Sequence, residues 1–151
     1  MYKLAGLQYL GRQTALIIQT GYDIDRVKQL ERLFEPDKVI LALQTGDQFG
    51  NAAQNRNKHI NAFSSRRDIE TFDVDGYSID SIYESFLAQI ELIVGSYNVV
   101  ISSLGPKVGA LALYKIKNTF PDISMCYAPS NEFNQEYSKG ISDSVYGVLK
   151  F

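Results

Sequence analysis

The sequence predicts one α/β domain, a doubly wound and mostly parallel sheet of five or six strands with helices on both faces. Short apolar runs alternate with helical patterns along the chain, which is typical of parallel strands joined by right-handed crossovers. Four of the five runs are almost continuously apolar, as strands covered on both faces are. The 151 residues suffice for one core, so we expect a single domain over residues 1–151.

The predicted strands are short apolar runs bounded by turn-forming residues. Glu70 and Asp73 interrupt the third run, so we place this strand at an edge of the sheet. Residues 144–151 offer a further, sixth strand. The five runs are Thr14–Gln19, Lys38–Leu43, Ile69–Val74, Asn98–Ser102 and Ile123–Tyr127.

Four helical patterns lie between these strands. Asp23 and Ser78 are candidate N-caps, because a short side-chain oxygen can accept a free backbone N–H of a first turn. Pro36 and Pro121 follow two of the patterns and are typical stop signals. The predicted helices are Asp23–Phe34, Asn51–Phe63, Ser78–Ser96 and Lys107–Thr119.

Composition excludes several classes of protein. A net charge of −2 argues against a general nucleic-acid binder. The single cysteine, Cys126, excludes an internal disulfide and argues against a thiolate zinc site. The single histidine, His59, offers no histidine pair for a metal, and we predict no metal site.

The sequence also lacks membrane and export signals. No apolar run approaches the roughly 20 residues that span a bilayer, and the first residues lack the apolar core of a signal peptide. We therefore expect a cytoplasmic protein without a membrane partner. It can also be one domain of a longer protein.

Polar loops follow the predicted strands. In open parallel sheets, ligands bind beyond the carboxyl ends of the strands, where the strand order reverses. These rim loops are rich in glycine, proline and hydroxyl side chains, as the rim of a binding site is. They are residues 20–23, 44–49, 75–78, 102–107 and 128–131.

The rim loop "SSLGPK" has the parts of an anion site. Gly105 permits a sharp turn and a close approach, and the next helix begins with free N–H groups at its positive end. Lys107 adds a full charge, and Ser102 and Ser103 add hydroxyls. The alternative is a tight Gly-Pro turn with a solvated lysine. The polar neighbouring loops favour the anion site.

Other rim residues supply further candidate ligand contacts. Thr45 and Asp47 can bind ribose hydroxyls or cap the following helix, and Asn55 and Arg56 lie one turn beyond that loop. Ser130 lies in a loop able to close over a ligand. There is neither a GxGxxG turn after the first strand nor a GxxxxGK[ST] loop, so we expect neither an ordinary dinucleotide dehydrogenase nor a P-loop ATPase.

Two segments, "FEPDKVILALQTG" at 34–46 and "VVISSLGPK" at 99–107, resemble the CRISPR-associated Rossmann-fold (CARF) sensors and related Rossmann-like domains of prokaryotic defence proteins. The resemblance implies a Rossmann-like fold that binds an adenine nucleotide or cyclic oligonucleotide, usually across a homodimer. By position it implies that Gly105 and Lys107 contact the ligand. The residues that it implies as lining are Thr20, Gly21, Thr45 and Gly46.

The leading functional prediction is a Rossmann-like binding or regulatory domain for a phosphorylated ligand, most simply a nucleotide. One alternative is a nucleotide-processing enzyme, a hydrolase or glycosyl-transferring enzyme, that uses Asp47 or Asp75. The other is a homodimeric interaction domain without a ligand. The sequence identifies no cofactor and no catalytic residue.

Overall fold

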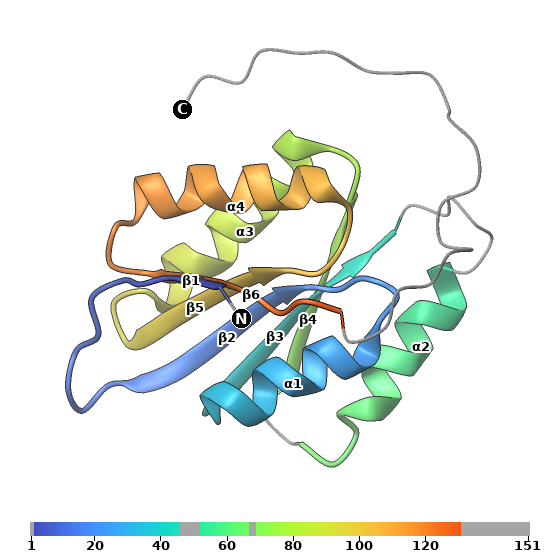
Figure 1. Cartoon of the computed structure of the whole chain (residues 1–151), viewed down its shortest axis with the longest axis horizontal. Helices are drawn as coiled ribbons and strands as arrows, with labels where there is room; N and C mark the ends of the chain where they lie inside the picture. The colour runs from blue at the N-terminus through green and yellow to red at the C-terminus, as the bar shows by residue number, and fades with distance from the viewer. Residues whose placement is uncertain (1, 46–51, 67–68, 131–151) are drawn as a thin grey trace.

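The computed structural model describes residues 2–45, 52–66 and 69–130. Strands and helices alternate along these residues, as the sequence predicts (Figure 1). The elements are β1 (Tyr2–Leu4), β2 (Gln13–Gln19), α1 (Ile24–Phe34), β3 (Lys38–Gln44), α2 (Ala52–Ala62), β4 (Ile69–Val74), α3 (Ile79–Ile93), β5 (Tyr97–Ser103), α4 (Lys107–Thr119) and β6 (Ser124–Tyr127).

The strands form one sheet in the order β1-β6-β5-β2-β3-β4. The five strands from β2 to β6 are parallel, and only β1 runs antiparallel, against β6. After β4 the chain returns to the middle of the sheet and places β5 beside β2. This is a Rossmann-like, doubly wound arrangement, and it reverses the strand order between β2 and β5.

The edge position of β4 is confirmed, since β4 pairs only with β3 in the sheet order. The sequence did not predict β1, because three residues in a segment without hydrophobic alternation carry too little pattern. The possible strand at residues 144–151 lies outside the described residues.

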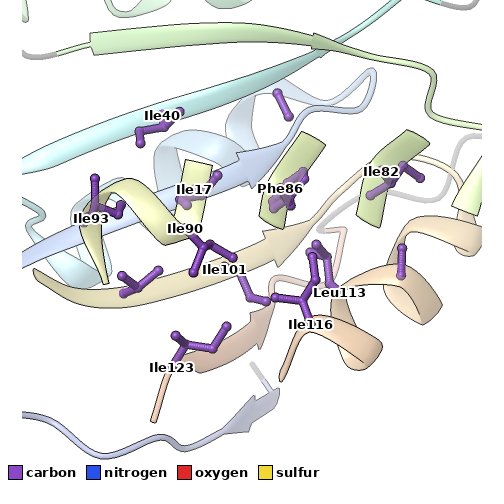
Figure 2. Packing of buried hydrophobic residues seen from close by; sticks show 14 of the residues in the cluster. Ile17, Ile40, Ile82, Phe86, Ile90, Ile93, Ile101, Leu113, Ile116 and Ile123 are labelled. Atoms are coloured by element: carbon purple, nitrogen blue, oxygen red, sulfur yellow. The ribbon is translucent and has the colours of Figure 1, made fainter. Parts of the chain in front are cut away.

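The two faces of the sheet have separate cores. In Figure 1, α3 and α4 lie over one face, and α1 and α2 lie under the other. Successive strand residues point to opposite faces, so Ile17 of β2 packs under α3 and α4, whereas Leu16 packs against α1. Figure 2 shows Ile17 and Ile101 of the central strands in the same cluster as Phe86 of α3 and Leu113 of α4.

The helix ends follow local chemistry. Asp23 and Ser78 are the N-caps of α1 and α3, as predicted. The sequence predicts that the third helix continues to Ser96, but α3 ends at Ile93 and a turn leads into β5.

Cys126 is buried in β6. In the described ranges, no helix has the length and apolar content needed to span a bilayer.

Candidate functional site

The loops after β2 and β5 meet where the strand order reverses, and we call this junction the switch point. The N–H of Leu104 donates to the carbonyl of Gln19 (2.9 Å), so the pairing of β2 with β5 extends past the strand ends. The two loops are in direct backbone contact, because a Cβ atom on Gly21 would lie 1.9 Å from the Leu104 carbonyl oxygen. Only glycine fits this position without moving a backbone.

A buried glutamine lies beneath the switch point. Gln19 is 0% exposed, and Ser103, its register partner in β5, donates a hydrogen bond from Oγ to its Oε1 (2.8 Å). The same Oε1 packs closely against Gly109 in the first turn of α4. A Cβ atom added to Gly109 would lie only 1.8 Å from Oε1. Gln19 Nε2 has no hydrogen-bond partner, and it lies 3.0 Å from the Cβ position of Gly105.

Sequence reasoning missed Gln19. The available signal was an amide at the last position of an otherwise apolar strand, "TALIIQ". Such a residue must satisfy its polar atoms inside the protein. Only its Oε1 does so, by accepting from Ser103 of β5 close to Gly109 in the first turn of α4, whereas Nε2 has no partner.

The N-terminus of α4 is not closed by a side chain. Its N-cap, Pro106, makes no side-chain cap hydrogen bond, and the first turn contains no acidic residue. The free N–H groups of a first turn carry the positive end of the helix dipole. Lys107 is exposed at this end, so the terminus combines backbone donors with a full positive charge.

The other two helices with described N-caps begin with a side-chain cap. The Asp23 side chain of α1 accepts from the N–H groups of Asp25 (2.9 Å) and Arg26 (3.4 Å). Ser78 caps α3, and Asp80 lies in its first turn. These oxygen atoms occupy the donors that an external anion would need. Of the three described N-caps, only that of α4 is open.

Four predicted ligand-contacting hydroxyls hold the strand ends together. Each donates within the fold, mostly to a backbone carbonyl of the neighbouring strand. Their part in ligand binding stays a prediction. The bonds join Thr20 to Ala42 O (2.9 Å), Thr45 to Val74 O (3.3 Å), Ser102 to Cys126 O (3.0 Å) and Ser103 to Gln19 Oε1 (2.8 Å).

The second group of predicted residues lies away from the switch point. Arg56 of α2 forms an ion pair with Asp73 of β4, and β4 is separated from β5 by β2 and β3. Asn55 uses its carbonyl to accept from His59 Nδ1 (2.8 Å). The structure therefore does not bring Arg56 together with Lys107.

Of the two carboxylates that the enzyme alternative would use, the structure describes only Asp75. Asp75 Oδ1 accepts the N–H of Tyr77 (3.0 Å) in the turn before α3, which is the bond that a turn residue makes. Asp47, together with Gly46, lies outside the described residues. The described residues gather no group of three or more His, Cys, Asp or Glu side chains able to hold a metal ion.

Arg26 is a rim cation that sequence reasoning also missed. Its Nε donates to the carbonyl of Ala128 (2.7 Å), just past β6, and its guanidinium lies 5.0 Å from the ring centre of Tyr127. Its Nη2 is buried and has no hydrogen-bond partner. Arg26 therefore brings a charged donor to the loop that contains the exposed Ser130. The sequence signal was a basic residue in the first turn of α1.

His59 is buried behind the loop after β2. It is 1% exposed, and because the Asn55 carbonyl can only accept, Nδ1 carries the hydrogen. Burial is the main cause that lowers the pKa of His59, and the charge of Lys58 lowers it further. The Asn55 carbonyl and the Asp23 carboxylate act in the opposite direction. His59 is therefore a neutral packing residue in this environment.

No protein-family model and no curated protein sequence matches the chain.

Proposed function

We propose that the chain binds a phosphorylated ligand, a nucleotide or a molecule of similar size, above the switch point. The phosphate lies against the N-terminus of α4, and the rest of the ligand extends over the loops after β2 and β6. The observation that carries the proposal is the open N-cap of α4 at Pro106. It faces the place where doubly wound folds bind their ligands.

Electrostatics support a phosphate in this position. A helix N-terminus without a cap has backbone N–H groups and a partial positive charge for an anion. Lys107 adds a unit charge that solvent reaches. The first turn of α4 has no carboxylate to compete for these donors, in contrast to α1, which has Asp25 there.

The surroundings support a ligand larger than phosphate. Tyr22 lies in the loop after β2, and Tyr127 is the last residue of β6. Each exposes nearly half of its surface. Half-exposed tyrosines offer flat apolar surface on which a base can stack. Arg26, anchored on Ala128 O, holds a guanidinium beside the Tyr127 ring. These groups fit a ligand with one anionic and one aromatic part.

Recognition without turnover is the simpler form of this proposal. The Asp75 carboxylate is engaged in its own turn, and the described carboxylates at the switch point are Asp23, which caps α1, and Asp25 in the first turn of α1. Two predictions from the sequence stay predictions: that Asp47 serves an enzyme, and that the chain shares the ligands of CARF sensors.

The test is thermal and chemical denaturation of the full chain with phosphate, AMP, ADP and ATP. A ligand at a hundred times its dissociation constant stabilises by about 2.7 kcal/mol. Lys107→Ala should lower the affinity, whereas Lys115→Ala should leave it unchanged, because Lys115 lies near the other end of the same helix. Raising the salt concentration should weaken binding.

Two results would contradict the proposal. One is the absence of stabilisation by any of these ligands at millimolar concentration. The other is equal stabilisation of the Lys107→Ala and Lys115→Ala variants, because binding would then lie elsewhere or be unspecific. Stabilisation followed by release of inorganic phosphate would instead favour the enzyme alternative.

A further inference from the structure

A turn between β1 and β2 holds a leucine entirely in solvent. The N–H of Arg12 donates to the carbonyl of Tyr9 (3.3 Å), which closes a four-residue turn. Its third residue, Gly11, has a φ of 81°, the positive φ that a type II turn requires at that position. Leu10 at the tip has a relative exposure of 103%. A leucine in this position gains nothing for the isolated chain.

The turn is held in place by the beginning of β5. Asn98 Oδ1 accepts the N–H of Tyr9 (2.8 Å), and Asn98 Nδ2 donates to the carbonyls of Tyr9 (3.0 Å) and Arg12 (3.1 Å). The Tyr9 hydroxyl donates to Asp122 (2.8 Å) before β6. The shape of the turn is therefore fixed, and a partner meets Leu10 without ordering the loop.

A cavity of about 190 Å³ opens beside this turn. Its lining residues include Arg12, Asn98 and Ile123, which lie at the amino ends of β2, β5 and β6, so the cavity is at the opposite end of the sheet from the switch point. Its lining is mainly apolar, and a cavity on the order of 150 Å³ already holds a molecule the size of benzene. It is lined by Leu7, Tyr9, Arg12, Val94, Gly95, Tyr97, Asn98, Val99, Asp122 and Ile123.

We propose that this face is a two-fold interface between two copies of the chain, with Leu10 of each copy inserted into the cavity of the other. A two-fold interface needs one surface that carries both a protrusion and a matching recess. Leu10 is the protrusion, and the adjoining cavity is the recess. The inference is independent of the proposed ligand site, because the two lie at opposite ends of the sheet.

Charge complementarity supports a second copy as the occupant. Arg12 and Asp122 both line the cavity and both contact Tyr9, Arg12 over the face of the ring and Asp122 at the hydroxyl. They form no ion pair with each other among the described residues. In a two-fold arrangement, the guanidinium of Arg12 can face the carboxylate of Asp122 in the other copy, twice per dimer. Arg12 stacks on its own Tyr9 ring at 4.2 Å and donates from Nη1 to the carbonyl of Val94 (3.4 Å), so the contact with the other copy would use its remaining N–H groups.

The contact surface is small, so we expect a reversible dimer rather than a permanent one. The test is sedimentation of the full chain over about 1 μM to 1 mM, which spans weak association. We expect a concentration-dependent dimer. Leu10→Ser should raise its dissociation constant roughly a hundredfold or more, because one leucine is lost from each half of the interface.

Leu33→Ser is the matched control, because Leu33 is a half-exposed leucine on α1 that does not line the cavity. It should leave the dissociation constant unchanged. A chain that stays monomeric throughout would overturn the proposal, as would a dimer that Leu10→Ser does not weaken.

A charge exchange tests the arrangement of the two copies. Arg12→Asp and Asp122→Arg should each weaken the dimer, and the double variant should recover most of the loss. Circular dichroism and unfolding would check that each variant is folded. A double variant as weak as the product of the two single variants would overturn the two-fold pairing.

Discussion

The N-termini of α1 and α4 lie on opposite faces of the sheet at the same switch point, and they are built in opposite ways. At α1, Asp23 accepts two backbone N–H groups and Asp25 adds a second negative charge. At α4, Pro106 supplies no side-chain cap and Lys107 adds a positive charge. The first terminus is closed by side-chain oxygens, whereas the second has no side-chain cap, and there the N–H of Gly109 donates to the carbonyl of Pro106 (2.9 Å).

If the proposed site is right, this difference separates a contribution to stability at α1 from ligand binding at α4. A capped terminus contributes to the free energy of unfolding, since an N-cap is worth about 1 kcal/mol. An uncapped terminus forgoes that contribution and keeps a site for a ligand. Changing the contact between the two loops, or exchanging the caps of the two helices, tests this difference.

The largest expected effect comes from Gly21→Ala, which separates the two termini. The new Cβ would stand 1.9 Å from the Leu104 carbonyl oxygen, and one of two backbones must move. We expect a loss of about 3 kcal/mol in the free energy of unfolding, measured by urea denaturation. Gly95→Ala is the control, because a Cβ there meets nothing within 4 Å. Equal stability of both variants would show that the loops are not in tight contact.

Removing the cap of α1 should have a smaller effect. Asp23→Ala leaves the N–H groups of Asp25 and Arg26 without their acceptor, and we expect a loss of about 1 kcal/mol. Binding of phosphate at α4 should persist. Urea denaturation with and without phosphate measures both quantities in one experiment. A loss of phosphate stabilisation in this variant would place the anion at α1 instead.

A pH effect tests the surroundings of the α1 terminus. Burial lowers the pKa of His59 below its ordinary value of 6.5, so below about pH 6.5 the unfolded chain binds a proton that the folded chain resists. The free energy of unfolding should therefore fall as the pH drops through 6.5 and stay level above it. His59→Gln should remove this part of the slope between about pH 8 and about pH 5.5. An unchanged slope would contradict the assignment.

The smallest expected change in stability has the sharpest functional consequence. Pro106→Asp gives α4 the kind of cap that α1 has. The added cap and the lost proline offset each other, so the free energy of unfolding should change by less than about 1 kcal/mol. Phosphate stabilisation should disappear, because the carboxylate occupies the donors. Pro106→Ala, which adds no carboxylate, should keep it, and calorimetric titration distinguishes the two variants.

Local patterns in the sequence predicted most of the elements. The apolar runs and helical spacings placed five strands and four helices within a few residues of their observed bounds, because periodicity follows from which faces are buried. Glu70 and Asp73 predicted that β4 lies at an edge. The caps Asp23 and Ser78 were also predictable, since each acts on residues two or three positions away.

The candidate site was predicted in part. The loop at Gly105 and Lys107 follows from the rule that ligands bind at the carboxyl ends of parallel strands. Gln19 and Arg26 were missed, because their roles depend on residues far along the chain. Gln19 meets Ser103 across 84 positions and Arg26 meets Ala128 across 102. Arg56 was assigned to the site by sequence proximity, whereas its ion pair with Asp73 holds it near β4.

Local patterns in the sequence were enough to predict five of the six described strands, the four described helices and the edge position of β4. Hydrophobic spacing and capping act over a few residues, so they can be read along the chain. Only the tertiary structure decided that β5 lies beside β2 and that β1 pairs with β6. It also decided that Asn98 holds the turn carrying Leu10 from 89 residues away. These contacts join distant segments, and the packing of two cores on one sheet selects them.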